Sequence, residues 1–228
     1  MATLGDLRSD LRIWTSTQNN PAVLPDVVCD ECINGAISLM QESHLWRGQE
    51  TTSIPLSYPA SSESIALPED FVAQRAIYQS TNGGTVPLLA YMEKTLRDEW
   101  LRSEQPAGGL RDPEYPQVAP PGTPDGWGIR YAIWRERLYL LPVPTATVQL
   151  VLDYYARVPW LSDPTRANFF TMRYPHVVRY GALADAYSYL HEEDRSGTYR
   201  QMFEAMLARV ILDDKNLRFA GGTTDRGA

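Results

Sequence analysis

The spacing of apolar residues changes twice along this chain of 228 residues, and these changes restrict the folds that it can adopt. Towards both ends, apolar residues recur every three or four positions, which is typical of one face of an α-helix. In the middle they form short runs or alternate with polar residues, as in Val148–Tyr154, which is typical of a β-strand with one buried face. The sequence therefore predicts an α+β fold.

Four longer helices are expected at the two ends of the chain, with one short helix in the middle. Thr3 can cap the first helix, and the second starts near Pro25, a residue favoured at the first position of a helix. Ser196-Gly197 is expected to form a corner before the last helix. The predicted bounds are Leu4–Trp14 for the first helix, Tyr174–Leu190 for the third, Tyr199–Leu217 for the last and Met92–Leu101 for the short one.

The β-like runs are separated by turn residues such as Asn82-Gly83-Gly84, where a positive φ costs little. The last two runs, Arg137–Leu141 and Thr147–Arg157, are expected to form a hairpin across Pro142–Thr145. The other expected strands are Thr52–Tyr58, Ser64–Leu67, Phe71–Gln79, Val86–Leu89 and Trp127–Trp134.

This order of segments predicts two domains. Because amphipathic helices need partners for their apolar faces, residues 1–48 and 164–218 are expected to form one helical bundle, with residues 49–163 inserted as a β-rich domain. Residues 103–125 contain six Pro and three Gly, which favours an exposed loop. Residues 219–228 have almost nothing to bury and are expected to form a flexible C-terminal tail.

The charge and composition argue against several classes of protein. The chain has 28 Asp plus Glu against 21 Lys plus Arg, a net charge of −7, which disfavours a protein that grips nucleic acid over a wide surface. No apolar run approaches the ~20 residues of a membrane helix, and the N-terminus lacks the pattern of a signal peptide. Two cysteines are too few to staple a domain of this size. We therefore expect a soluble protein of the cytosol without a membrane partner.

Cys29-Asp30-Glu31-Cys32 is the one motif-like spacing in the chain. Such a C-x-x-C pair can be a redox pair or half of a zinc site. A zinc site needs two further ligands, whereas His44, His176 and His191 are scattered, and a thioredoxin-like pair belongs at a strand-to-helix junction rather than inside a helix. We favour structural cysteines in the core or at a helix boundary, and keep a metal or redox role as the alternative.

Two acidic clusters, Glu192–Asp194 and Asp213-Asp214, could act as general acids and bases or bind a hard cation. We expect both at helix ends or on exposed helix faces, so solvated charges are the favoured interpretation. His176 has no nucleophile beside it and is interpreted as a capping or surface residue.

The aromatic residues are interpreted as packing in the core and at interfaces, and alternation in Tyr154-Tyr155 is expected to bury one of the two rings. The sequence contains none of the common phosphate-binding or nucleophile motifs. It therefore predicts no catalytic residue, no cofactor and no metal.

Five strings, taken in order, carry a resemblance to a known family. They are IALPEDF at 65–71, VPL at 86–88, RLYLLPVP at 137–144, the YY and VPWLS of 152–162, and NFF followed by YP in 168–175. In this order the chain resembles the head–tail adaptor proteins of short-tailed bacteriophages, the family that includes tail tubular protein A and related head-completion connectors. The resemblance covers about Leu4 to Gly222. The loop at 103–125 and the pair Cys29/Cys32 depart from the family pattern.

The resemblance implies a structural protein of the virion, without catalytic residues, located at the head–tail interface and assembled in the host cytoplasm. It implies a ring, usually a dodecamer, that sits below the portal and lines the channel through which the genome is ejected. The implied partners are the portal protein, tail nozzle or tail fibre proteins and further copies of the chain, while DNA passes without specific binding. In relatives the C-terminal helix and tail reach the portal, so the implied portal-binding residues are Leu217, Arg218, Phe219, Gly221 and Gly222.

Two other hypotheses are kept beside the connector. One is a tail-associated enzyme, either a wall hydrolase using Glu193 and Asp194 or a thiol redox protein using Cys29 and Cys32. The other is a different kind of protein-binding module. The ordered strings and the missing active site favour the connector.

Overall fold

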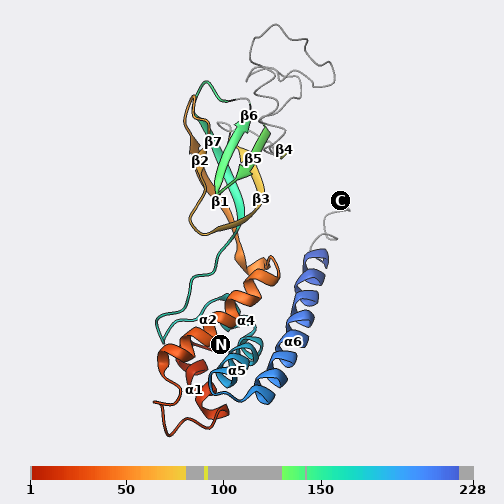
Figure 1. The fold of residues 1–228 in the computed structure, drawn as a ribbon. Coiled ribbons are helices and arrows are strands. Elements are labelled where there is room, and N and C mark those ends of the chain that lie inside the picture. The colour runs from red at the N-terminus through yellow and green to blue at the C-terminus, as the bar shows by residue number, and fades with distance from the viewer. Residues whose placement is uncertain (1, 81–89, 92–129, 142, 221–228) are drawn as a thin grey trace. The chain divides into compact units, whose positions relative to one another are not determined.

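The computed structural model describes residues 2–80, 90–91, 130–141 and 143–220, and it combines helices with two small sheets (Figure 1). The predicted α+β fold class is confirmed. The expected strand at 86–89, the expected helix at 92–101 and the expected loop at 103–125 lie outside the described residues. The elements are α1 (Leu4–Trp14), α2 (Asp26–Ser43), η1 (Arg47–Gln49), β1 (Glu50–Tyr58), β2 (Ile65–Ala66), β3 (Phe71–Gln79), β4 (Ala90–Tyr91), β5 (Arg130–Trp134), β6 (Arg137–Leu141), β7 (Val148–Ala156), α4 (Phe169–Arg173), α5 (Pro175–Tyr189) and α6 (Glu193–Ala220).

The chain divides into two compact units. Unit 1 consists of Met1–Gln49 and Arg157–Ala228 and contains the described α-helices, and unit 2 consists of Glu50–Ala156 and contains the strands. The segment 157–168, which leads from β7 to α4, belongs to unit 1 because side chains of α2 hold its backbone. Within the described residues, none of the helices is long and apolar enough to span a membrane.

Local capping explains where α1 begins. The Thr3 hydroxyl accepts a hydrogen bond from the Asp6 N–H, and the Asp6 carboxylate accepts one from the Thr3 N–H, so α1 starts with a capping box. Pro25 is the residue before α2 rather than its first residue. Arg8 of α1 donates two hydrogen bonds of 2.6 Å to the carboxylate of Asp30, which joins α1 to α2.

The turn between α5 and α6 differs from the prediction. Ser196-Gly197 is not a corner but part of α6, which starts at Glu193. The chain reverses at His191, whose φ of 60° is left-handed, and the Glu192 N–H donates to the carbonyl of Tyr187 across it. The Ser196 hydroxyl then donates to the carbonyl of Ala184 at 2.8 Å, which ties the start of α6 to α5.

Three helices meet at Gly181 of α5. A Cβ at this position would lie 2.7 Å from the Cβ of Ala36 in α2 and 3.0 Å from the ring of Phe203 in α6. The absence of a side chain therefore lets α2 and α6 pack against the same point of α5. The N-terminal and C-terminal helices share one core, which includes Leu7, Ile33, Val177, Leu183 and Val210.

Unit 2 contains two sheets, with strand orders β1-β7-β3 and β2-β6-β5-β4. The predicted hairpin between Arg137–Leu141 and Thr147–Arg157 is wrong, because β6 pairs with β5 and β2 while β7 pairs with β1 and β3. β6 is instead joined to β5 by the turn Arg135-Glu136, in which both residues have positive φ, as a tight two-residue hairpin turn requires. The segment after β6 carries the chain from one sheet to the other.

Both tyrosines of the Tyr154-Tyr155 pair are buried, so the expectation that only one would be is wrong. β1 and β3, the two neighbours of β7, change register near this end of the strand, which disturbs the simple alternation. The Tyr154 hydroxyl donates to Asp70 at 2.8 Å, and the Tyr155 hydroxyl donates to Glu50 at 3.3 Å. Burial and the neighbouring Asp70 carboxylate raise the pKa of Tyr154 to about 12.

Candidate functional site

The two cysteines are core residues, as the favoured interpretation predicted. Cys29 and Cys32 are both buried in α2 and are free thiols. Burial raises the pKa of the Cys29 thiol and raises that of Cys32 to about 12. Both shifts favour the protonated thiol over the thiolate, which is the form that acts in redox chemistry.

The acidic clusters do not converge on one another. Glu193 and Asp194 are exposed in the first turn of α6, where the helix dipole favours acidic side chains. Asp213 is exposed, but Asp214 is buried against His44 with 3.0 Å between Oδ2 and Nε2, so the prediction of a solvated Asp214 is wrong. A buried carboxylate needs such a partner, and the end of α2 supplies it. Within the described residues, no group of three or more His, Cys, Asp or Glu could hold a metal ion.

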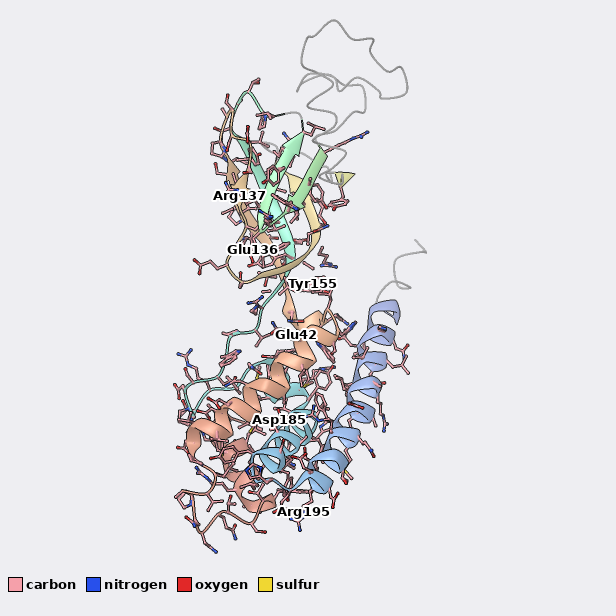
Figure 2. The ribbon with its side chains drawn as sticks, in the orientation of Figure 1. Glu42, Glu136, Arg137, Tyr155, Asp185 and Arg195 are labelled. Atoms are coloured by element: carbon pink, nitrogen blue, oxygen red, sulfur yellow. The ribbon has the colours of Figure 1, made fainter. Side chains whose placement is uncertain are left out.

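α6 is attached to the bundle along a narrow stripe. Ser196, Phe203 and Val210 are buried at seven-residue intervals, while most other residues of the helix are exposed. Asp185 of α5 accepts a hydrogen bond of 2.9 Å from Arg200 of α6. Burial raises the pKa of this carboxyl group, and Arg200 acts in the opposite direction. Figure 2 shows Asp185 within the bundle and Arg195 at the start of α6.

The residues expected to bind the portal lie at the end of this helix. Leu217 follows Val210 by seven residues, yet its exposed fraction is 42% because it lies past Asp214, the last buried residue of α6 among those whose side chains are described. Arg218 and Phe219 belong to α6, and the structure does not describe their side chains. The predicted tail therefore starts at least two residues later than 219, and Gly221 and Gly222 lie outside the described residues.

An open groove of about 930 Å³ lies in unit 1 between α4, the start of α5 and the middle of α6. Phe169 and Met172 of α4 and Met206 of α6 give it an apolar surface, and Met172 is 48% exposed. Its charged and polar lining consists of Arg173, His176, Arg209 and Asp213. His176 is half-buried and lines this groove. It is a surface residue, as one of its two predicted roles had it, but its surface is that of the groove.

The segment 157–168 presents the most exposed large apolar side chain of the described residues. The exposed fraction of Trp160 is 69%, although the residues on either side of it are held in place. The Val158 N–H donates to the side chain of Gln41 at 3.0 Å, and Leu161 is hydrogen-bonded to Asn34 of α2. Tryptophan is enriched at the buried centres of protein–protein interfaces.

Sequence reasoning missed the groove, the exposed Trp160 and the pair His44–Asp214. The residues of α4 that line the groove are more than thirty positions from those of α6, and no local pattern links the two sets. A weak signal was available on α6, where Met202, Met206, Arg209 and Asp213 follow helical spacing beside the buried stripe. The groove and Trp160 are surface features, whereas His44 and Asp214 form a buried contact between the end of α2 and α6.

The family model described as the SU10 adaptor protein matches residues 2–226, which is nearly the whole chain. No curated protein matches the chain.

Proposed function

Because the chain belongs to the SU10 adaptor protein family and is thus a structural adaptor of a phage, we propose that its copies form a ring below the portal and join the capsid to the tail. The match over nearly the whole chain is the observation that carries this proposal. It agrees with the resemblance found in the sequence, which rests on strings from both units.

The surfaces of unit 1 support an assembly role. Trp160, Met172 and Leu217 are exposed apolar residues on separate segments, as expected of a subunit that contacts more than one partner. We assign the end of α6, from Leu217 onward, to the portal. The tail nozzle or tail fibre proteins then bind the opposite end of the ring, which consists of twelve copies.

The charge of the chain supports a channel role. With a net charge of −7 the chain has no excess of positive charge to neutralise phosphates, so DNA can slide past without being held. The protein needs no reaction of its own for this task, and the cysteines and acidic clusters serve the fold and the surface.

A phage with a stop codon early in this gene tests the proposal. We expect capsids to fill with DNA but to carry no tails, and we expect a plasmid copy of the gene to restore tailed particles. Tailed, infectious particles that lack the protein would show that it does not join head to tail.

A further inference from the structure

We propose that the exposed face of α2 in one copy docks into the groove between α4 and α6 of the next copy, so that this pair of surfaces forms the subunit contact of the ring. The inference rests on the proposed function, because it identifies the surfaces by which the proposed ring closes. It commits to a second copy of this chain as the occupant of the groove.

The groove is cationic in a chain that is acidic overall. Arg173 and Arg209 both line it, and neither forms an ion pair with another described residue. Asp213 is the one acidic residue in its lining, which also includes the imidazole of His176. The apolar side chains of Phe169, Met172 and Met206 lie among these charges. Such a mixture suits a partner with apolar and acidic side chains better than a bare phosphate chain.

The exposed face of α2 has the matching chemistry. Val27 and Leu39 are large apolar residues with exposed fractions of 67% and 45%, and Glu31 and Glu42 are exposed acidic residues. Neither glutamate forms an ion pair with another described residue. The four positions are spaced by four, eight and three residues, which places them on one side of the helix. Figure 2 shows Glu42 near the C-terminal end of α2.

Most of this face is exposed because α2 uses its other sides in the bundle. Within the face, Gly35 lies near α5, since a Cβ at this position would be 3.5 Å from the Oδ2 of Asp185. Its buried stripe, which includes Ile33 and Ile37, packs in the core of unit 1, and Asn34 and Gln41 hold the segment 157–168. At about 1.5 Å per residue, the face from Val27 to Glu42 is about 22 Å long. A helix that lays apolar and charged residues into a groove is a common mode of recognition.

The face of α2 and the groove are different surfaces, so a contact between them is heterologous. Each copy then offers one face and one groove, and a series of such contacts ends only when it closes into a ring. Opposite charges on the two surfaces also fix which sides of neighbouring copies meet.

Reversing the charges of the two surfaces in separate variants tests the inference. The first variant carries Glu31→Arg and Glu42→Arg, and the second carries Arg173→Glu and Arg209→Glu. Each protein is mixed with purified portal, and the fraction of portals that carry an adaptor ring is counted in electron micrographs. Each variant alone places like charges at every contact, so we expect at least about a tenfold drop in that fraction.

An equimolar mixture of the two variants restores opposite charges at every contact when the copies alternate around the ring. We expect the mixture to recover at least about half of the wild-type ring fraction, since both reversed surfaces then meet a complementary one. Unchanged assembly by the first variant, or a mixture that stays as defective as its components, overturns the inference. A groove variant that fails while the α2 variant assembles normally also overturns it, because another molecule then occupies the groove.

Two controls make the outcomes distinct. Glu204→Arg reverses an exposed charge on the other edge of α6 and should assemble like the wild type. Thermal unfolding of the isolated variants should match that of the wild type, because the replaced residues are at the surface. If the wild-type protein itself forms no ring on the portal, the proposed function fails; if it does and the variants do too, only the subunit contact is wrong.

Discussion

Asn34 of α2 forms two hydrogen bonds with the backbone of Leu161. Its Oδ1 accepts from the Leu161 N–H at 2.9 Å, and its Nδ2 donates to the Leu161 carbonyl at 3.0 Å. Both residues are buried, and they are 127 positions apart in the chain. These two hydrogen bonds hold the segment 157–168, through which the chain returns to unit 1 after unit 2. They therefore also hold the backbone next to the exposed Trp160.

Replacing Asn34 with Leu should destabilise unit 1 by about 2–3 kcal/mol, because the N–H and carbonyl of Leu161 lose their partner while buried. Thermal unfolding followed by circular dichroism measures the change. Gln41→Ala is the comparison, since it removes a single hydrogen bond to Val158 in a half-buried place and should cost about 1 kcal/mol. An Asn34→Leu protein as stable as the wild type would show that the pair does not hold this segment.

Two Gly→Ala substitutions should have effects of opposite sign. Gly181→Ala places a methyl group 2.7 Å from the Cβ of Ala36 and should destabilise the bundle by about 1–3 kcal/mol. A Cβ at Gly197 in α6 meets nothing within 4 Å, so Gly197→Ala should stabilise the protein by about 0.5–1 kcal/mol through helix propensity. Urea unfolding gives both values. A destabilising Gly197→Ala would mean that Gly197 is a corner after all.

The longer helices could be predicted from the sequence because the spacing of their apolar residues is a local pattern. Leu4, Leu7 and Leu11 mark one face of α1 without reference to the rest of the chain, and Thr3 marks its start. Most of the described strands were also predicted at about the right positions, but the predicted pairing of β6 with β7 was wrong. Whether β6 pairs with β7 or with β5 depends on contacts between whole sheets, and the short segment between β6 and β7 looked like a hairpin turn.

The candidate surfaces were harder to predict from the sequence because they depend on contacts between distant parts of the chain. His44 and Asp214 are 170 positions apart, and their contact depends on how α6 passes the end of α2. The groove depends on α4, a helix of five residues whose periodicity is too short to detect. Trp160 is exposed on a segment that Gln41 and Asn34 hold by hydrogen bonds, and no pattern around residue 160 indicates these contacts. The functional class was inferred from the family resemblance, because these residues alone do not indicate it.

The Cys32 thiol should make stability depend on alkaline pH. Its pKa is raised from the ordinary 9.0 to about 12 by burial, so the folded protein keeps a proton that the unfolded chain releases above about pH 9. The contribution is fully present below that pH and is lost as the pH rises towards 12, at up to about 1.4 kcal/mol per pH unit.

Urea unfolding of the wild type and of Cys32→Ala at about pH 8 and about pH 10 measures this dependence. The variant should be less stable at the lower pH because a cavity replaces the thiol, and it should lose less stability on going to the higher pH. Equal losses in the two proteins would mean that the thiol is not protected by burial.

Removing the residues after Phe219 should leave the fold intact and weaken attachment to the portal. The deleted positions include Gly221 and Gly222, and Asp214 is the last buried residue of α6 among those whose side chains are described. Thermal unfolding should therefore be unchanged, and the affinity for the portal, measured by biolayer interferometry, should fall by at least about tenfold if these residues order on binding. Equal affinity of the truncated and complete proteins would refute the assignment of the C-terminus to the portal.

Electron microscopy of the purified protein mixed with its purified portal shows whether the protein forms a ring there. The isolated subunit can remain monomeric, because the ring can assemble on the portal alone. We expect a ring of the protein docked on one end of the portal, with an open channel along the common axis. Portals that remain bare at saturating concentrations of the protein would contradict this expectation.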